Sequence, residues 1–291
     1  MIRRIATIAT TVALFVAPLA GRGADLDVRG ILNGCIGCSL ADKDMHGADL
    51  HGISLVGTNM RRVNLDGAHL SDVRFTGVNL DDANLNNADL RDAKFVGTSL
   101  RGTTFARANL EGATFTGVSL GRTNIIDGNR RGLIRTCTGC NLSGVDLSSA
   151  DLRSIHFVGS NLSDVKLANS DLRDAVLVGA NLRDSDMSAT QLSGANLVGA
   201  NLSRATVHGA SFGNVELCSR NHSYYNNAST GRDETVCANL RDVDLHGMNV
   251  SQALWCDSDR GEMDRKSCRP VTRVELVDVA HANLAGATAP N

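Results

Sequence analysis

The sequence predicts an all-β fold in which the chain forms a four-sided coil, with each coil stacked on the one before it. Three observations support this prediction: a large apolar residue at every fifth position, a small or β-branched residue two positions earlier, and a glycine that returns every twenty residues. Only 3% of the 291 residues are aromatic, which excludes a conventional sandwich or α/β core built on bulky rings. A hydrophobic content of 42% argues against disorder.

The five-residue period runs from Leu40 to Ile125 and again from Cys137 to Leu217. It fits neither the 3.6-residue period of a helix nor the plain alternation of a strand. Within each unit, the order small, polar, large alternates inward, outward, inward, as in a very short strand, and the other two residues form a corner. Such units bury their leucines only when each turn of the chain stacks on the previous turn.

The twenty-residue period sets the number of sides, because twenty residues make four units. Each of these glycines follows a β-branched residue, so the β-branched residues form a vertical stripe on one side. Gly37 and Gly139 are five coils plus two residues apart, which predicts an unbroken coil with two extra residues at 128–134. Parallel pairing between coils gives a rise of about 4.8 Å per coil. The stripe comprises Ile36, Val56, Thr76, Val96, Thr116, Thr138, Val158, Val178 and Val198.

Two shorter stretches extend the pattern toward the C-terminus. Counting all units predicts about 10 coils and a rod roughly 50 Å long. The large positions are Leu240, Leu245, Val250 and Trp255 in the first stretch, and Val274, Val279, Leu284 and Ala289 in the second.

The expected organisation is one solenoid behind an exported start. Residues 1–23 place Arg3 and Arg4 before an apolar run, as in a secretory signal peptide, with cleavage between Ala20 and Ala24. We therefore expect a periplasmic or secreted protein in an oxidising compartment, without an integral membrane segment. The other expected segments are an N-terminal cap at 24–34, two halves at 35–127 and 135–219 around the 128–134 side, Cys-bounded loops at 220–237 and 258–271, a coil at 238–257 and a terminal coil at 272–291.

Repeated triplets carry a family resemblance. Ala-Asp-Leu at 88–90 and Ala-Asn-Leu at 108–110 and 195–197 resemble the pentapeptide-repeat family, whose units are Ala-(Asp/Asn)-Leu-x-x. The resemblance covers roughly 33–291 and implies a right-handed quadrilateral parallel β-helix, but no particular activity. Some members of the family resemble duplex DNA and protect DNA gyrase, and that subgroup is cytoplasmic and strongly acidic. This chain has a net charge of −2, so we expect neither that role nor a nucleic-acid partner.

Eight cysteines in an exported chain predict a disulfide framework. Cys35/Cys38 and Cys137/Cys140 form two Cys-x-Gly-Cys motifs that point inward, and we favour a structural pair in each over a redox-labile disulfide or a metal site. Five coils separate the motifs by ~24 Å, whereas Zn–S bonds are about 2.3 Å, which argues against one shared zinc.

The other four cysteines bracket the two loops. Local pairing, Cys218 with Cys237 and Cys256 with Cys268, would close each loop at its base. Cys218 and Cys256 also occupy the same corner one coil apart, at ~4.8 Å, which a disulfide accepts. The sequence leaves both pairings open.

We predict no enzyme and no cofactor. The Asp and Asn residues between the inward pairs should face outward and bind water, and they are too regularly spaced for an acid/base pair. The eight histidines are scattered over outward positions. The loop acids Asp257, Asp259, Glu262 and Asp264 depart from a calcium-loop spacing, so a solvated loop is expected there.

The predicted function is therefore a structural scaffold or protein-interaction surface for an unidentified protein partner. Contact candidates are the stripe, Tyr224, Tyr225 and Trp255, although β-branched residues also suit the extended backbone before a corner glycine. A thiol-redox or metal-binding protein and a carbohydrate-binding solenoid are the functional alternatives. The rod end near Pro290 needs a cap or a partner, and a homodimer through a solenoid end would supply one.

Overall fold

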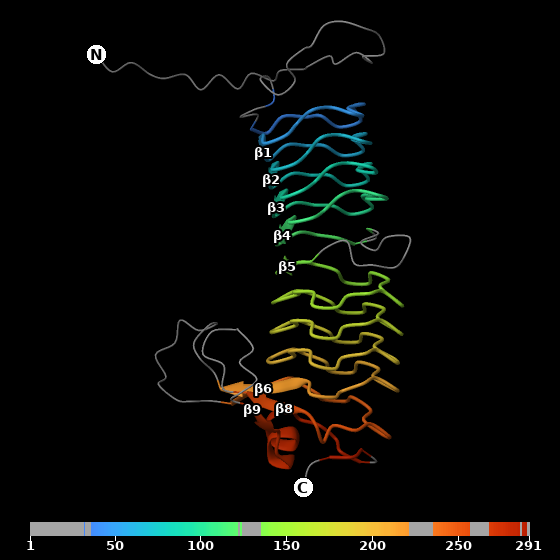
Figure 1. The fold of residues 1–291 in the computed structure, drawn as a ribbon, viewed down its shortest axis with the longest axis vertical. Coiled ribbons are helices and arrows are strands. Elements are labelled where there is room, and N and C mark those ends of the chain that lie inside the picture. The colour runs from blue at the N-terminus through green and yellow to red at the C-terminus, as the bar shows by residue number, and fades with distance from the viewer. Residues whose placement is uncertain are drawn as a thin grey trace, which may run out of the picture.

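The protein is a tall rod of stacked four-sided coils in a computed structural model (Figure 1). The structure describes residues 32, 36–121, 123, 135–220, 235–256, 268–285 and 287–289. The expected signal peptide, Cys35, the 128–134 side, Tyr224, Tyr225, the acids at 257–264 and Pro290 lie outside these ranges.

Each corner of the coil places one residue in the left-handed backbone region. After Met60, for example, Arg62 has φ 55°, and the N–H of Val63 donates to the Met60 carbonyl at 3.1 Å. Gly, Asp and Asn tolerate positive φ better than other residues, which explains their frequency at this position. Gly57, in the glycine series beside the stripe, has φ 61°.

One side of the coil is a continuous parallel sheet through the first half of the rod. Successive strands lie twenty residues apart, with Leu55 opposite Phe75 and Val56 opposite Thr76. The last pairing joins Thr116 to Thr138, so the ladder continues across the two extra residues. The strands, in spatial order, are β1 (Ser54–Val56), β2 (Arg74–Thr76), β3 (Lys94–Val96), β4 (Thr114–Thr116) and β5 (Cys137–Thr138).

The large residues of the repeat form one continuous apolar core, and the small residues such as Ala68 and Ala83 lie beside them. In β2, Arg74 and Thr76 are exposed on either side of buried Phe75, which confirms the alternation expected of each unit. Phe75, Phe95 and Phe115 stack along the axis with ring centroids 4.9 and 4.7 Å apart. Coil stacking therefore brings identical positions of successive coils into direct contact.

A second, four-stranded sheet lies toward the C-terminal end of the rod (Figure 1). Its central strands pair in parallel as successive coils, whereas each outer strand pairs antiparallel with the strand that precedes it in the chain. The spatial order is β7 (Thr235–Cys237), β6 (Glu216–Arg220), β8 (Leu254–Cys256) and β9 (Cys268–Pro270).

The prediction of a coil from residue 272 onward is wrong for the first part of that segment, because the short π-helix η2 (Glu275–Val279) lies there. Val274 is 65% exposed rather than buried, Val279 is also exposed, and Leu276 fills the core instead. A capping box explains the change: the Glu275 N–H donates to Thr272 Oγ1 at 3.3 Å, and the Thr272 N–H donates to Glu275 Oε2 at 2.8 Å. The coil then resumes, since Leu240 N–H donates to the Ala280 carbonyl and Thr288 bridges Asn249.

Within the described ranges, no helix has the length and apolar character of a membrane span.

Candidate interaction face

The stripe lies on the side of the coil that contains β1 to β5, which we call the stripe face. Its outward residues form two rows along the rod. The first row is the stripe itself, which pairs from Ile36 to Val56 and onward through the strands. The second row lies two residues earlier in each coil, ends at the buried Asn196, and comprises before it Ser54, Arg74, Lys94, Thr114, Thr136, His156 and Val176.

The first row is open to solvent in the N-terminal half of the rod. Ile36, Val56 and Val96 are 77%, 37% and 44% exposed, and Thr76 and Thr116 between them are exposed as well. Exposed apolar side chains at regular spacing on a flat sheet are a feature of contact surfaces. Further along the stripe, Thr138 is exposed, whereas Val158, Val178 and Val198 are half-buried.

The chain itself covers the C-terminal end of the stripe face. The stripe position after Val198 is Cys218, which is buried and bonded to Cys237 of β7. Val236 of β7 lies against the preceding corner, because a Cβ added at Gly199 would be 3.5 Å from Val236 Cγ1. We call the part formed by β1 to β5, where the stripe residues are exposed, the free part of the stripe face.

The stripe face carries positive charge that no acidic residue on the face balances. Arg74 and Lys94 are paired neighbours in the second row, both are exposed, and neither forms an ion pair with any described residue. From Ile36 to Val198, the two rows contain no Asp or Glu. Any partner of this face meets a cationic edge beside an apolar and threonine-rich stripe.

Arginines elsewhere on the rod commonly pair with aspartates. Arg62 contacts Asp42 at 2.6 Å, and Arg153 contacts Asp151 at 2.7 Å. The hydrogen bond from Arg153 lowers the pKa of the Asp151 carboxyl from 3.8 to about 2. Such pairs neutralise part of the charge on the other surfaces.

The adjacent side of the coil carries a column of asparagines and serines. In its second half each asparagine amide donates to the asparagine one coil earlier, as in Asn181 Nδ2 to Asn161 Oδ1 at 3.1 Å. Each side chain also accepts a hydrogen bond from the backbone two residues on, such as Ser163 N–H to Asn161 Oδ1 at 3.2 Å. The expectation that these side chains simply bind water is therefore incomplete. The column is Ser39, Asn59, Asn79, Ser99, Ser119, Asn141, Asn161, Asn181, Asn201 and Asn239.

The Cys-x-Gly-Cys motif of the second half is a disulfide inside the core. Cys137 and Cys140 are joined, with Cα atoms 5.6 Å apart, and both are buried. Cys38 is also disulfide-bonded, whereas Cys35 lies outside the described residues. In this form the Cys137–Cys140 sulfurs offer no thiolate to a metal and little access to a thiol reagent.

The C-terminal cysteines pair locally. Cys218 bonds to Cys237 and Cys256 bonds to Cys268, whereas the cross-coil bond between Cys218 and Cys256 does not form. The reason is strand direction, because each antiparallel pair brings its two cysteines directly opposite one another, with Cα atoms 4.0 and 4.1 Å apart.

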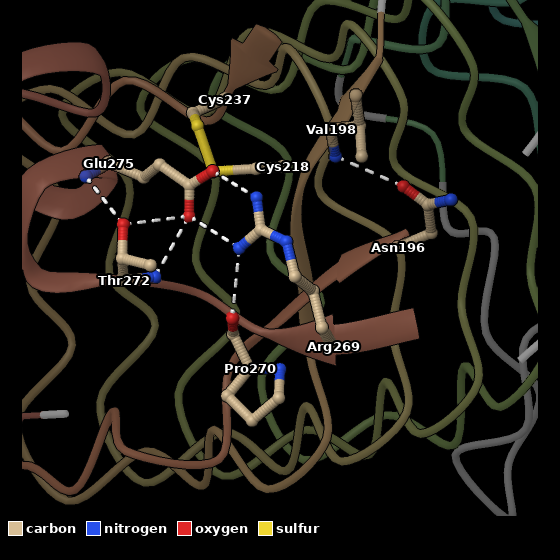
Figure 2. The surroundings of a disulfide bond; sticks show 8 residues. All are labelled: Asn196, Val198, Cys218, Cys237, Arg269, Pro270, Thr272 and Glu275. Atoms are coloured by element: carbon tan, nitrogen blue, oxygen red, sulfur yellow. Dashed lines mark hydrogen bonds and ion pairs between the residues drawn. A yellow bond between two sulfur atoms is a disulfide. The ribbon is translucent and has the colours of Figure 1, made fainter. Parts of the chain in front are cut away.

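Polar contacts hold η2 onto the end of the rod (Figure 2). Arg269 reaches the Glu275 carboxylate at 2.9 Å, and Thr272 binds the same group, which lowers the pKa of Glu275 through these hydrogen bonds, chiefly that of Arg269. The Arg269 guanidinium also lies 4.4 Å from the centroid of the buried Trp255 ring. Trp255 is therefore a packing residue, and its ring is not an exposed platform for a sugar.

Two features of this region escaped the sequence analysis. The capping-box pattern Thr272-Arg-Val-Glu275 was available as a helix signal but conflicted with the five-residue count. The buried hydrogen bond from Asn196 Nδ2 to Glu216 Oε2, at 2.8 Å, joins two residues that the twenty-residue register places opposite one another, and that spacing was the available signal. Across the part of the chain that is described, no three His, Cys, Asp or Glu side chains come close enough to hold a metal ion.

Two family models match the sequence. One, described as a pentapeptide repeat region, matches residues 35–105 and 68–133. The other, described as pentapeptide repeats (8 copies), matches 140–179, 160–197 and 180–217. Together these spans cover more than half of the chain. Comparison with curated proteins gives no match.

Several solved structures are similar in fold. HetL, a pentapeptide repeat protein involved in heterocyst differentiation regulation from the cyanobacterium Nostoc sp. strain PCC 7120, is 26% identical over 73% of this chain and 83% of its own, with a TM-score of 0.47. Full-length QnrB1, a plasmid-mediated fluoroquinolone resistance protein, is 16% identical over 72% and 92%, with a TM-score of 0.22. A pentapeptide repeat protein of the Arabidopsis thaliana thylakoid lumen is 15% identical over 70% and 87%, with a TM-score of 0.14.

Proposed function

Because the chain belongs to the pentapeptide-repeat family, whose members are generally structural or interaction proteins rather than enzymes, we propose that it is a non-enzymatic scaffold whose stripe face binds another protein. One observation carries the proposal. The free part of the stripe face is a flat sheet with exposed Val56 and Val96, and its cations Arg74 and Lys94 have no acidic counterpart on the face.

Rigidity supports a role in binding. Backbone hydrogen bonds join each coil to the next, and the stacked phenylalanines lie directly behind the face. A surface that is already ordered loses little conformational entropy when a partner binds. The stripe face is therefore suited to display side chains at fixed spacing.

The proposed location is the periplasm or the extracellular space. Arg3, Arg4 and the apolar run after them support export, and the three disulfides in the described ranges support an oxidising compartment. Cell fractionation with N-terminal sequencing of the purified protein tests this. A mature chain that begins near Ala24 in the exported fraction is expected, and an uncleaved chain in the cytosol would contradict export.

Site-specific photo-crosslinking in the native cell tests the binding face. A photoreactive residue replaces Thr76 on the stripe face or, as a matched control, Thr206, which is also exposed and lies on the opposite side of the coil. We expect one protein to be crosslinked from position 76 and not from position 206. Equal labelling from both positions, or none from position 76, would overturn the proposal.

A homodimer through the C-terminal end is a second part of the proposal. Val274, Val277 and Val279 are exposed around η2 at this end of the rod, so a second copy would find an apolar contact there. The thiol-redox and carbohydrate alternatives receive no such support, because Cys137, Cys140 and Trp255 are buried.

A further inference from the structure

We propose that the stripe face binds an amphipathic α-helix of a partner protein, in which aliphatic residues are flanked on one side by carboxylates. This inference rests on the proposed function and specifies the chemistry of the partner.

The backbone of the stripe face excludes a partner that binds by strand addition to the face. Its peptide groups are already paired with neighbouring coils: Arg74 N–H donates to the Ile53 carbonyl at 2.9 Å, and Gly57 N–H donates to the Thr76 carbonyl at 2.8 Å. A segment that lies across this face can therefore make contacts only through side chains. Its own buried peptide groups must be satisfied internally, and an α-helix does this.

The spacing of the two rows suits a helix that lies along the rod. Successive stripe residues are one coil apart, about 4.8 Å, and a helix presents the same face once per turn of about 5.4 Å. From Ile36 to Thr138 the stripe takes five steps, roughly 24 Å, which matches about 16 helical residues. The mismatch accumulates to only about 3 Å over that length, which side-chain torsions can absorb.

The size of the stripe residues favours a continuous aliphatic ridge in the partner. Val56, Thr76, Val96 and Thr116 all have β-branched side chains of similar volume, so the first row is level. A helix with aliphatic residues at i, i+3, i+4 and i+7 fits a level row of this kind.

The charges fix which edge of the helix is acidic. Arg74 and Lys94 lie one coil apart in the second row, on one edge of the stripe only. Carboxylates at positions i and i+4 of a helix are separated by a similar distance, about 6 Å. Beyond the opposite edge of the stripe lie the corner glycines, Gly57, Gly77 and Gly97, and the asparagine column, which offer no charge.

A nucleic acid or an anionic membrane suits this surface less well. Duplex DNA carries one phosphate charge per about 1.7 Å of its axis, whereas the free face presents Arg74 and Lys94 over roughly 24 Å. Exposed Ile36, Val56 and Val96 have no role against a phosphate backbone, but they bury apolar area against a helix.

The experiment uses the mature protein and two synthetic 18-residue helical peptides with the same aliphatic ridge. One peptide has glutamates along one edge, and the other has lysines there. We expect the glutamate peptide to bind at least about tenfold more tightly in fluorescence anisotropy at low salt, with the difference reduced at high salt. Circular dichroism should show the bound peptide as helical.

Charge reversal on the face supplies the decisive comparison. The double variant R74E/K94E should reverse the preference in favour of the lysine peptide. The control R107E/R241E changes the net charge equally at exposed arginines that lie off the stripe face and form no described ion pair, and it should leave the preference unchanged.

Three outcomes would overturn the inference: neither peptide binds, the preference survives R74E/K94E, or a duplex DNA oligonucleotide or anionic vesicle binds the face more tightly than the glutamate peptide. If neither peptide binds but a protein is still crosslinked at position 76, the acidic helix is rejected and the proposed scaffold function stands. Peptide binding without a crosslinked protein in cells would reject the scaffold function instead.

Discussion

At the scale of single residues, positive φ angles decide where the chain turns. Aspartate, asparagine and arginine occupy many of these corners, and Ala189 occupies one with φ 54°. A Cβ in this region costs about 1–2 kcal/mol, whereas glycine pays only its greater backbone entropy, about 0.5–1 kcal/mol. The identity of the corner residue therefore tunes stability without altering the core.

Ala189→Gly should stabilise the protein by about 0.5–1 kcal/mol in urea unfolding. The reverse change, Gly57→Ala, should destabilise it by about 1 kcal/mol through φ alone, because the nearest atom to the added Cβ is Gly37 N at 3.9 Å. If Ala189→Gly lowered the free energy of unfolding as Gly57→Ala does, corner strain would not be the controlling factor.

The Asp151–Arg153 pair predicts a pH-dependent contribution to stability. The pKa of Asp151 is about 2 in the folded protein, below its ordinary value of 3.8, so the pair stabilises the fold fully above about pH 4 and loses this effect as the pH falls through about 2. Asp151→Asn should lower the free energy of unfolding at pH 7 by less than about 1 kcal/mol, because Arg153 is exposed and Asp151 is only partly buried. The difference between wild type and variant should shrink as the pH falls through about 2 and vanish below it, and a difference that persists well below pH 2 would exclude the pair as its source.

At the scale of elements, local hydrogen bonding competes with the repeat. The five-residue count continues through Val274 and Val279, but the capping box of Thr272 and Glu275 starts a helix. Thr272→Ala should therefore destabilise the C-terminal end by about 1 kcal/mol, as loss of an N-cap does. Arg273→Ala, at an exposed position next to Thr272 and outside the group of exposed valines, serves as the control and should be nearly neutral in thermal unfolding.

If Thr272→Ala had no effect, the capping box would not be what holds η2 in place. Amide hydrogen exchange provides a second measurement. In Thr272→Ala, the exchange rate should rise around Leu276 while the rates in β1 to β5 stay unchanged, because the end of the rod unfolds locally.

Burial predicts the order in which the disulfides are reduced. Cys237 and Cys268 are only half-buried, whereas Cys137 and Cys140 are both inaccessible. Under native conditions, a water-soluble reductant should open Cys218–Cys237 and Cys256–Cys268 first, and Cys137–Cys140 only after unfolding. Differential alkylation and mass spectrometry would measure this order, and early reduction of Cys137–Cys140 would revive the thiol-redox hypothesis.

At the scale of the whole molecule, the solenoid has two ends that cannot pair as interior coils do. The C-terminal end buries Leu276 but leaves Val274, Val277 and Val279 exposed. Light scattering on the purified protein should give a concentration-dependent dimer, and Val277→Asp should shift it to the monomer by placing a charge in the apolar contact.

Arg107→Glu, on a distant corner, should leave the dimer intact. A monomer at every concentration in the wild type would remove the homodimer from the proposed function.

The coil could be predicted from the sequence because each unit obeys a local rule. The positions of Leu55, Phe75 and Phe95 twenty residues apart determined the four sides and the core, since any other arrangement would expose the whole apolar column. The stripe followed from the same count, but its exposure did not, because the cover over Val198 comes from β7 after an interruption of the repeat.

The sequence by itself determined the period, the number of sides, the inward column and the residues of the stripe. Only the tertiary structure decided the pairing of Cys218 with Cys237, the helix at 275–279, and the absence of an ion pair between Arg74 or Lys94 and any described residue. The physical reason is the difference in sequence separation between the two kinds of contact. A repeat fixes contacts between residues at constant spacing, whereas loops, caps and ion pairs depend on which segments meet after the spacing is broken.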